Sequence, residues 1–363
     1  MIGKINKLAE NRIPFLLIVD FEMKKPLLFQ LDELPGDIRF STPSLASPGE
    51  TVYSAIDGPE SPYKVSAGAA EGISFKAADR IPPNTSGRIP SNTSDRIPSD
   101  ATDPGFVVEA VPYERYLNAF ELVRENALAG NTYLTNLTFP TRLRTRLSLD
   151  EIFTMSRAKY RLMYGDRFVV FSPETFVQIR DGRIRSFPMK GTIDAGIPGA
   201  RDLLLNDRKE MAEHVTIVDL IRNDLSIHAR RVHVERFRYI DTLVTSGKTL
   251  LQASSVITGE LPGDYRPRLG EILYSMLPAG SVSGAPKHKT LRIISEAEGS
   301  DRGYYTGVMG IFDGNDFDSA VMIRYIEKTG SELYYRSGGG ITHLSDPEKE
   351  YRELIDKVYV PLS

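Results

Sequence analysis

A hairpin signal in the middle of the chain predicts two neighbouring strands and the loop that follows them. Residues 177–180 and 183–185 alternate apolar and polar side chains on either side of Asp181-Gly182, and an Asp-Gly pair in that setting is typical of a two-residue turn. In the following loop, residues 187–192, Lys190 comes just before a glycine, which lets a substrate approach the backbone closely. Lys190 is then either a solvated lysine after a turn or, if burial lowers its pKa, a nucleophile.

The order of the predicted elements favours an α+β fold. Strands come mostly in adjacent runs with helices between the runs, which is typical of antiparallel sheets rather than of a doubly wound parallel sheet. Strands are expected at 15–21, 26–31, 133–139, 167–171, 177–180, 183–185, 231–238, 250–258, 307–312, 319–327 and 333–336. Helices are expected at 113–129, 148–160 with a capping box at Ser148 and Glu151, 207–225 capped by Asn206, 269–277, 288–297, and from Asp346-Pro347 onward.

The composition divides the chain into three parts. Residues 1–40 are expected to form an N-terminal hairpin region, and residues 106–363 a large catalytic domain. Residues 41–105 are rich in Pro, Ser, Gly, Asn and Thr, and contain three copies of an eight-residue unit that starts with Arg-Ile-Pro. Units so short and polar cannot bury a core, so we interpret this part as a loosely held surface insertion.

The composition also excludes several classes of site. The chain has no cysteine, which excludes disulfides, thiolate metal sites and cysteine nucleophiles. A net charge of −3 gives no basic footprint for nucleic acid, and no apolar run is long enough to span a membrane. The N-terminus has no apolar segment typical of a signal peptide, so we expect a cytoplasmic protein. Any metal should be a hard ion held by carboxylates.

Two helices place paired glutamates on one face. Glu210 and Glu213 are three residues apart, as are Glu350 and Glu353, and this spacing brings side chains together on a helix. Two such pairs brought together would need a cation, and oxygen ligands imply Mg²⁺. The alternative is that both pairs belong to solvated helix faces.

Three further segments offer groups for binding an anion or moving a proton. Gly338-Gly339-Gly340 predicts a glycine-rich turn, either a plain tight turn or one whose N–H groups bind a carboxylate. Arg324, on an otherwise apolar strand, either pairs with a buried acid or clamps a carboxylate ligand. Glu174 ends an apolar strand in Ser172-Pro173-Glu174 and offers one carboxylate, although the same pattern is typical of a cap.

These segments, in this order, resemble the chorismate-utilising enzymes, which include the anthranilate, aminodeoxychorismate, isochorismate and salicylate synthases. The resemblance covers residues 106–363 well and the first hundred poorly. The matching segments are Ser172-Pro173-Glu174, Pro188-Met189-Lys190-Gly191-Thr192, Lys209-Glu210-x-x-Glu213-His214, 218–224, 278–287, Arg302-Gly303-x-Tyr305-x-Gly307, Ile323-Arg324, Gly338-Gly339-Gly340-Ile341 and Glu350-x-x-Glu353-x-x-x-Lys357. The resemblance implies two antiparallel sheets packed as a sandwich, with helices outside.

Within this family, a lysine in Pro-x-Lys-Gly-Thr resembles aminodeoxychorismate synthase component I, because anthranilate synthases usually carry alanine there. The resemblance implies that Lys190 attacks C2 of chorismate and expels the C4 hydroxyl, with Glu174 as general acid/base. Ammonia then adds at C4 to give 4-amino-4-deoxychorismate, for para-aminobenzoate and folate synthesis. The implied Mg²⁺ ligands are Glu210, Glu213, Glu350 and Glu353. The implied substrate-binding residues are Thr192, Gln252, Ser281, Tyr305, Arg324, Gly338, Gly339, Gly340 and Lys357.

Two side chains bear on what the resemblance implies, because a histidine of many relatives is replaced at position 252 and the chain has no cysteine. Gln252 stands where many relatives have histidine, and glutamine cannot transfer a proton, which places more weight on Glu174. Without cysteine the chain cannot release ammonia from glutamine by the usual route, so a separate glutamine amidotransferase subunit is implied. The alternatives are an anthranilate synthase component I, an isochorismate synthase, or a catalytically idle chorismate-binding subunit. Lys190 argues against the first two, and the intact acidic residues against the last.

Overall fold

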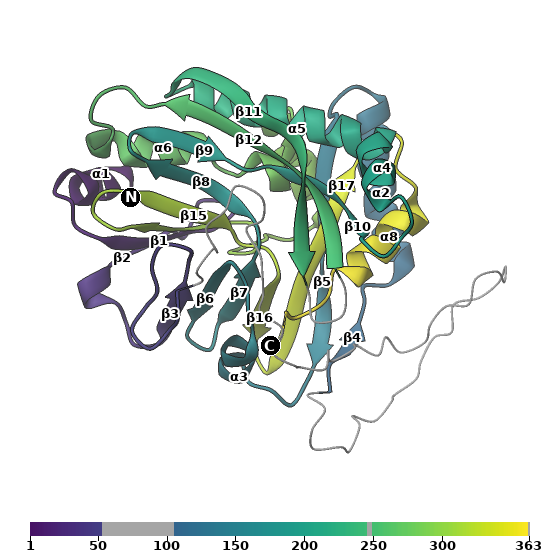
Figure 1. Cartoon of the computed structure of the whole chain (residues 1–363). Coiled ribbons are helices and arrows are strands. Elements are labelled where there is room, and N and C mark those ends of the chain that lie inside the picture. Colours follow the sequence, from purple (N-terminus) through teal and green to yellow (C-terminus); the bar gives the residue numbers. More distant parts are fainter. Residues whose placement is uncertain (53–104, 245–248, 362–363) are drawn as a thin grey trace.

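The computed structural model describes residues 1–52, 105–244 and 249–361. Over these ranges the chain forms two antiparallel sheets, with helices on their outer faces (Figure 1). The predicted α+β sandwich is therefore confirmed. The Arg-Ile-Pro repeats lie outside the described residues.

The helices are α1 Ile2–Glu10, α2 Tyr113–Leu128, α3 Leu149–Met155, α4 Ala200–Asn206, α5 Arg208–Ser226, α6 Leu269–Ser275, α7 Lys287–Glu298 and α8 Pro347–Asp356. The strands of the larger sheet are β1 Phe15–Val19, β2 Leu27–Gln30, β8 Thr175–Arg180, β9 Arg183–Ser186, β10 Met189–Asp194, β11 Arg230–Val244, β12 Thr249–Glu260, β14 Val308–Phe312 and β15 Phe317–Val321. The strands of the smaller sheet are β3 Ile38–Ser41, β4 Val107–Glu109, β5 Leu134–Arg144, β6 Tyr160–Tyr164, β7 Phe168–Ser172, β13 Gly284–Ala285, β16 Tyr325–Thr329 and β17 Glu332–Ile341.

The strand order interleaves the beginning of the chain with its end. The larger sheet runs β10-β12-β9-β8-β15-β14-β1-β2, and β11 also pairs with β12. The smaller sheet runs β13-β5-β17-β16-β7-β6-β3, and β4 also pairs with β5. Because β1 pairs with β14 and β3 pairs with β6, the first 41 residues share both sheets with the rest of the chain.

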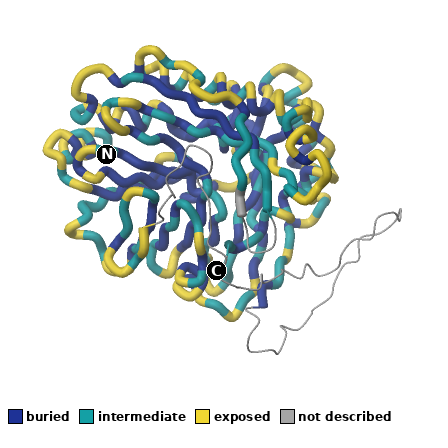
Figure 2. The backbone as a smooth tube through the Cα atoms, viewed as in Figure 1, coloured by how far each residue is buried: buried dark blue, intermediate teal, exposed yellow. Residues whose placement is uncertain are grey.

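Strand β1 shows why the sandwich needs both layers. Its five residues are all buried, and successive side chains of a strand point to opposite faces. Phe15, Leu17 and Val19 pack in a cluster with α1, α5 and α6, whereas Leu16 and Ile18 pack between the sheets with residues of β3, β6 and β7. Figure 2 shows the resulting buried tube segments at the centre of the molecule.

Several element boundaries differ from the prediction because tertiary pairing prevails over local pattern. The capping box of Ser148 and Glu151 is present, but its helix ends at Met155. The next segment pairs with β3 and β7 as β6, so the predicted helix to Tyr160 was too long. Asn206 ends α4 and does not cap α5, because Asp207 accepts the capping hydrogen bond. Helices α1 and α4 were not predicted.

Two crossovers between the sheets lie side by side. The strand predicted at 319–327 is two strands, because β15 belongs to the larger sheet and β16 to the smaller. Arg324 lies in the connection, with φ of 54°. Glu174 lies in the second connection, between β7 and β8. Backbone hydrogen bonds join the two, from Val321 N to the Glu174 carbonyl (3.1 Å) and from Phe171 N to the Arg324 carbonyl (3.0 Å).

Truncating Ile18 should lower the free energy of unfolding. The side chain is fully buried between the sheets, and Ile18→Ala should cost about 2–5 kcal/mol through lost burial and the cavity it leaves. Leu128→Ala, at a side chain 65% exposed, is the matched control and should be nearly neutral. Denaturant unfolding followed by circular dichroism measures both, and equal losses would contradict the assigned core.

Candidate active site

Lys190 lies on a strand rather than on the predicted loop. It belongs to β10, which pairs with β12, and the register shifts between Lys190 and Thr192. Gly191 forms this bulge with φ of +76°, a conformation that glycine adopts without strain. A methyl group at Gly191 would lie 2.8 Å from Leu204 and 3.2 Å from Glu210 Oε2, so the bulge also needs glycine for close approach to α4 and α5.

A chain of ion-paired side chains runs from Lys190 to the last helix. Lys190 Nζ lies 3.5 Å from Glu213 Oε2 on α5. Lys209, one turn earlier on α5, lies 3.4 Å from Glu213 Oε1 and 2.5 Å from Glu350 Oε1 on α8. The side chains of Glu213 and Glu350 are each only 4% exposed. Buried carboxylates need such partners, because taking an unpaired charge out of water is costly.

The three glycines belong to strand β17, so the predicted glycine-rich turn is wrong. Gly338, Gly339 and Gly340 pair with β5, while β16 ends opposite Arg336 and leaves their other edge without a neighbouring strand among the described residues. A methyl group at Gly340 would lie 2.8 Å from Glu213 Oε2 and 3.3 Å from Lys190 Nζ. These glycines therefore form the floor beneath the charges.

The second glutamate of α8 has a lysine of its own. Lys357 Nζ lies 2.6 Å from Glu353 Oε1 and donates to the Gly338 carbonyl at 2.9 Å. Burial raises the pKa of Glu353, but the Lys357 cation and hydrogen bond lower it more, and the net shift is downward. A methyl group at Gly339 would lie 3.5 Å from Glu353 Oε1 and 3.7 Å from Glu350 Oε2. The structure thus brings both predicted glutamate pairs to one place.

The charge network keeps Lys190 protonated. Burial lowers the pKa of Lys190, but the carboxylates of Glu213 and Glu210 lead a group of acids that raise it more, and the net shift is upward. The sequence-based condition for a nucleophile, a pKa lowered by burial, is therefore not met in this arrangement. Lys190 becomes a free amine only when the neighbouring carboxylates are neutralised or move.

Glu174 lies in an environment that raises the pKa of its carboxyl group. The residue is buried, and Ser281 Oγ donates to its Oε1 at 2.5 Å. Burial raises the pKa of Glu174 and outweighs the Ser281 hydrogen bond and nearby cations, which lower it. Lys190, Arg324 and Lys357 are among these cations, so Glu174 faces the same site as the charge network.

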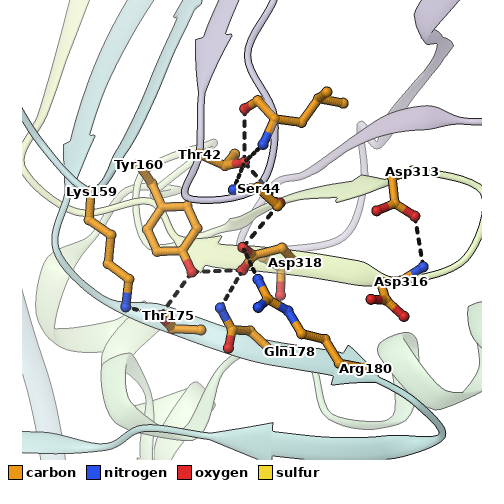
Figure 3. Close-up of polar contacts among 12 residues, drawn as sticks. Thr42, Ser44, Lys159, Tyr160, Thr175, Gln178, Arg180, Asp313, Asp316 and Asp318 are labelled. Carbon is orange, nitrogen blue, oxygen red and sulfur yellow. Dashed lines mark hydrogen bonds and ion pairs between the residues drawn. The ribbon is translucent and has the colours of Figure 1, made fainter. Parts of the chain in front are cut away.

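A polar network that the sequence did not reveal anchors the strand next to Glu174 (Figure 3). Thr175, the first residue of β8, accepts from Lys159 Nζ at 2.8 Å and lies 2.9 Å from the Tyr160 hydroxyl. Tyr160 donates to the buried Asp318 at 2.7 Å, and Gln178 donates to the same carboxylate oxygen at 3.1 Å. The network joins β6 of one sheet to β8 and β15 of the other. Its residues are scattered in the sequence and share no motif.

Arg324 has no acidic partner within 4 Å in the described part of the chain, which removes one of its two interpretations. Its guanidinium lies 4.9 Å from the centre of the Tyr359 ring, and its Nε is buried without a hydrogen bond. Tyr305 and Tyr335 also lie near enough to influence its charge. Burial raises the pKa of Tyr305 to about 12, so this hydroxyl remains a donor. A guanidinium that contacts tyrosines but no acid in the described ranges favours the carboxylate-clamp interpretation.

Gln252 and Thr192 lie across from each other on β12 and β10. Lys190 lies across from Ala253, and neighbouring residues of a strand point to opposite faces. Gln252 and Thr192 therefore share a face with each other rather than with Lys190, and their predicted contacts with substrate stay predictions.

The four glutamates fit a hard cation in composition but not in their present pairing. No three carboxylate or imidazole groups in the described ranges are arranged to hold a metal ion as they stand, because Lys209 lies between Glu213 and Glu350. One atom is nevertheless suited to a cation, since Glu213 Oε1 is buried and accepts no hydrogen bond. All-oxygen donors suit Mg²⁺, provided that Lys209 withdraws.

The chain matches a protein-family model described as chorismate binding enzyme over residues 15–363. It belongs to the chorismate-binding enzyme family. The family match confirms the resemblance of the motifs and extends it over most of the first hundred residues, where the motifs were poor. No helix in the described ranges is long and apolar enough to cross a membrane.

Relatives within the chorismate-binding family carry different names. An uncharacterised PabA-like protein of Pasteurella multocida is 51% identical over 257 residues, covering 71% of this chain and 78% of that protein. An uncharacterised PabA-like protein of Haemophilus influenzae is 41% identical over 361 residues, covering 99% of this chain and 96% of that protein. Anthranilate synthase component 1 1 of Haloarcula marismortui is 33% identical over 263 residues, covering 67% and 52%.

Solved structures support the same fold. Anthranilate synthase component I from Streptococcus pneumoniae has a TM-score of 0.57 at 26% identity, covering 70% of this chain and 58% of that one. A putative isochorismate synthase, DhbC, from Bacillus anthracis has a TM-score of 0.64 at 18% identity, covering 98% and 84%. At the latter identity the likeness concerns the fold alone.

Removing the Glu213 charge should lower the pKa of Lys190. In Glu213→Gln the largest carboxylate effect on the ammonium is lost, so Lys190 should react with an amine-modifying reagent at lower pH than in the wild type. The rate of Lys190 modification against pH, followed by peptide mass spectrometry, measures this shift. Glu348→Gln, on the exposed face of α8, is the control and should leave the profile in place. An unchanged profile in Glu213→Gln would show that the network does not hold the proton.

A methyl group at Gly340 should disrupt the site without unfolding the chain. Gly340→Ala must displace Glu213 or Lys190, and misplacing reacting groups by about 1 Å can cost about 100-fold in turnover. Gly36→Ala is the control, because no atom lies within 4 Å of the added methyl group. Chorismate consumption and thermal unfolding should be measured together, and full turnover in Gly340→Ala would refute the assigned floor.

Proposed function

We propose that the protein aminates chorismate at C4 with ammonia, yielding 4-amino-4-deoxychorismate, and so acts as an aminodeoxychorismate synthase component I in the cytoplasm. The observation that carries the proposal is the position of Lys190, on a glycine bulge between α5 and the glycine strand β17. Its amine can form a covalent bond to a ring placed between this strand and Glu174. Cations for a dicarboxylate substrate are present in Arg324 and Lys357.

The proposed reaction uses two groups with opposite proton states. Lys190, once deprotonated, forms a bond to C2 of chorismate while both ring double bonds shift by one position and the C4–oxygen bond breaks. Glu174 donates its proton to the departing hydroxyl, which leaves as water. Ammonia then bonds to C4, both double bonds shift back, and the bond between C2 and the lysine nitrogen breaks, which regenerates the amine.

The charge network explains how Lys190 loses its proton in this proposal. Glu210, Glu213, Glu350 and Glu353 carry four negative charges against the three positive charges of the lysines beside them, so a bound Mg²⁺ would leave the site with an excess of positive charge. A bound Mg²⁺ would neutralise these carboxylates and bind the ring carboxylate of the substrate. The ammonium of Lys190 would then lose the partners that raise its pKa, and Lys209 would turn away from Glu213.

Ammonia must come from outside the chain. The sequence has no cysteine for glutamine hydrolysis, so we propose a separate glutamine amidotransferase as partner in the cell. Free ammonium should replace this partner in the test tube.

Product analysis tests the function directly. Purified protein with chorismate, Mg²⁺ and ammonium should form a product that a lyase converts to 4-aminobenzoate. Lys190→Ala should still bind chorismate but yield almost no product, and Glu174→Gln should slow the reaction about 100-fold or more. Calorimetry of chorismate binding separates lost chemistry from lost binding.

Lys349→Ala, at an exposed residue of α8, serves as the control and should retain activity. Near-normal amination by Lys190→Ala would remove its assignment as nucleophile. If anthranilate formed instead, the amination would take place at C2. If isochorismate formed, water rather than ammonia would be the nucleophile. Tight chorismate binding with no product or adduct would indicate an idle subunit.

A further inference from the structure

A small cavity lies directly behind Glu174. Its volume is about 20 Å³, and its walls come from the start of β8, the C-terminal end of α5 and the loop at 276–281. A cavity needs about 10–15 Å³ to hold one water-sized molecule. This one can therefore hold a single small molecule such as water or ammonia, and it is far too small for chorismate.

The polar groups of the cavity wall are mostly acceptors. The carboxyl groups of Glu174 and Asp224 both line it, together with the hydroxyls of Thr175, Ser186 and Ser281. Ser281 Oγ already donates to Glu174 Oε1, so its oxygen is left to accept. Lys287 Nζ donates to Asp224 Oδ2 at 2.7 Å. Ammonia and ammonium carry more N–H donors than water carries O–H donors, so an acceptor-rich wall suits them better.

The remaining wall is apolar and closely packed. Val177, Leu225, Met276 and Ala279 line the cavity and are buried. Such a wall favours a neutral molecule inside the cavity over a charged one unless a carboxylate pairs with it. The apolar wall also limits the size of the bound molecule. Substitution can change this limit, since one methyl group has about the size of an ammonia molecule.

We propose that this cavity is the binding site of the ammonia that attacks C4, and that Glu174 lies beside both the waiting nucleophile and the ring. This inference rests on the proposed amination. It assigns Glu174 two contacts, the departing hydroxyl on one side and ammonia on the other. When the hydroxyl leaves with the proton of Glu174, the resulting carboxylate accepts a hydrogen bond from ammonia and takes up the proton that the nitrogen loses after bonding to C4.

Filling the cavity should weaken the use of ammonia and leave chorismate binding intact. In Ala279→Val the added methyl groups occupy the space, and the KM for ammonium should rise at least about tenfold, the usual effect of such a change in a closed pocket. The KM for chorismate should stay within about twofold. Ala119→Val, the same change in a buried core of α2 away from the cavity, is the matched control and should alter neither constant.

Enlarging the cavity provides an independent test that does not depend on tolerance of Ala279→Val. Val177→Ala removes methyl groups from the wall and should let methylamine act as nucleophile, giving an N-methylated product that wild type does not form. Val169→Ala, at a fully buried residue of another core cluster, is the control and should still exclude methylamine. Product mass distinguishes the two amines.

The outcomes separate this inference from the proposed function. If wild type forms no ammonia-dependent product, the amination itself is wrong. If wild type aminates chorismate but Ala279→Val keeps its KM for ammonium, or Val177→Ala still rejects methylamine, the cavity is not the ammonia site. An equal rise in both KM values would likewise overturn it, because the change would then act through the chorismate site.

Discussion

The structure depends on one group of charged side chains. Lys190, Glu213, Lys209 and Glu350 come from β10, α5 and α8, and the two buried glutamates need the partly exposed lysines as partners. This requirement fixes how the two helices lie against the open edge of β17. It also accounts for Gly340 at that edge and Gly191 in the β10 bulge, since a side chain at either position would come too close to a carboxylate, of Glu213 or Glu210.

The same charges divide the proton states of the site. Burial outweighs the nearby cations at Glu174 and raises its pKa, whereas at Lys190 the neighbouring carboxylates together outweigh burial and raise the pKa of the ammonium. Two titratable groups held in opposite states by their surroundings are a common arrangement for acid–base chemistry. In the proposed reaction Lys190 therefore cannot act as a nucleophile in the resting site, and it loses its proton only when cation and substrate are both bound.

The position of Glu174 and Arg324 follows from the way the chain changes sheets. Each lies in a connection between the sheets, and the two connections are hydrogen-bonded to one another. Residues at such crossovers leave the regular ladders and can turn their side chains toward a ligand. The network of Asp318, Tyr160 and Thr175 joins the two sheets beside these connections. The packing of the sheets therefore determines how far Glu174 lies from Arg324.

The sequence by itself determined the family, the α+β class, the Asp-Gly hairpin and the residue types of the site, because these follow from local patterns and ordered motifs. It also paired the glutamates correctly within each helix, since helical spacing is a local property. Only the tertiary structure decided that the glycine segment is a strand, that residues 319–327 divide between sheets, and that Lys190 is protonated. Those features depend on partners distant in the chain, and neither strand pairing nor a pKa can be read from the residues that flank a site.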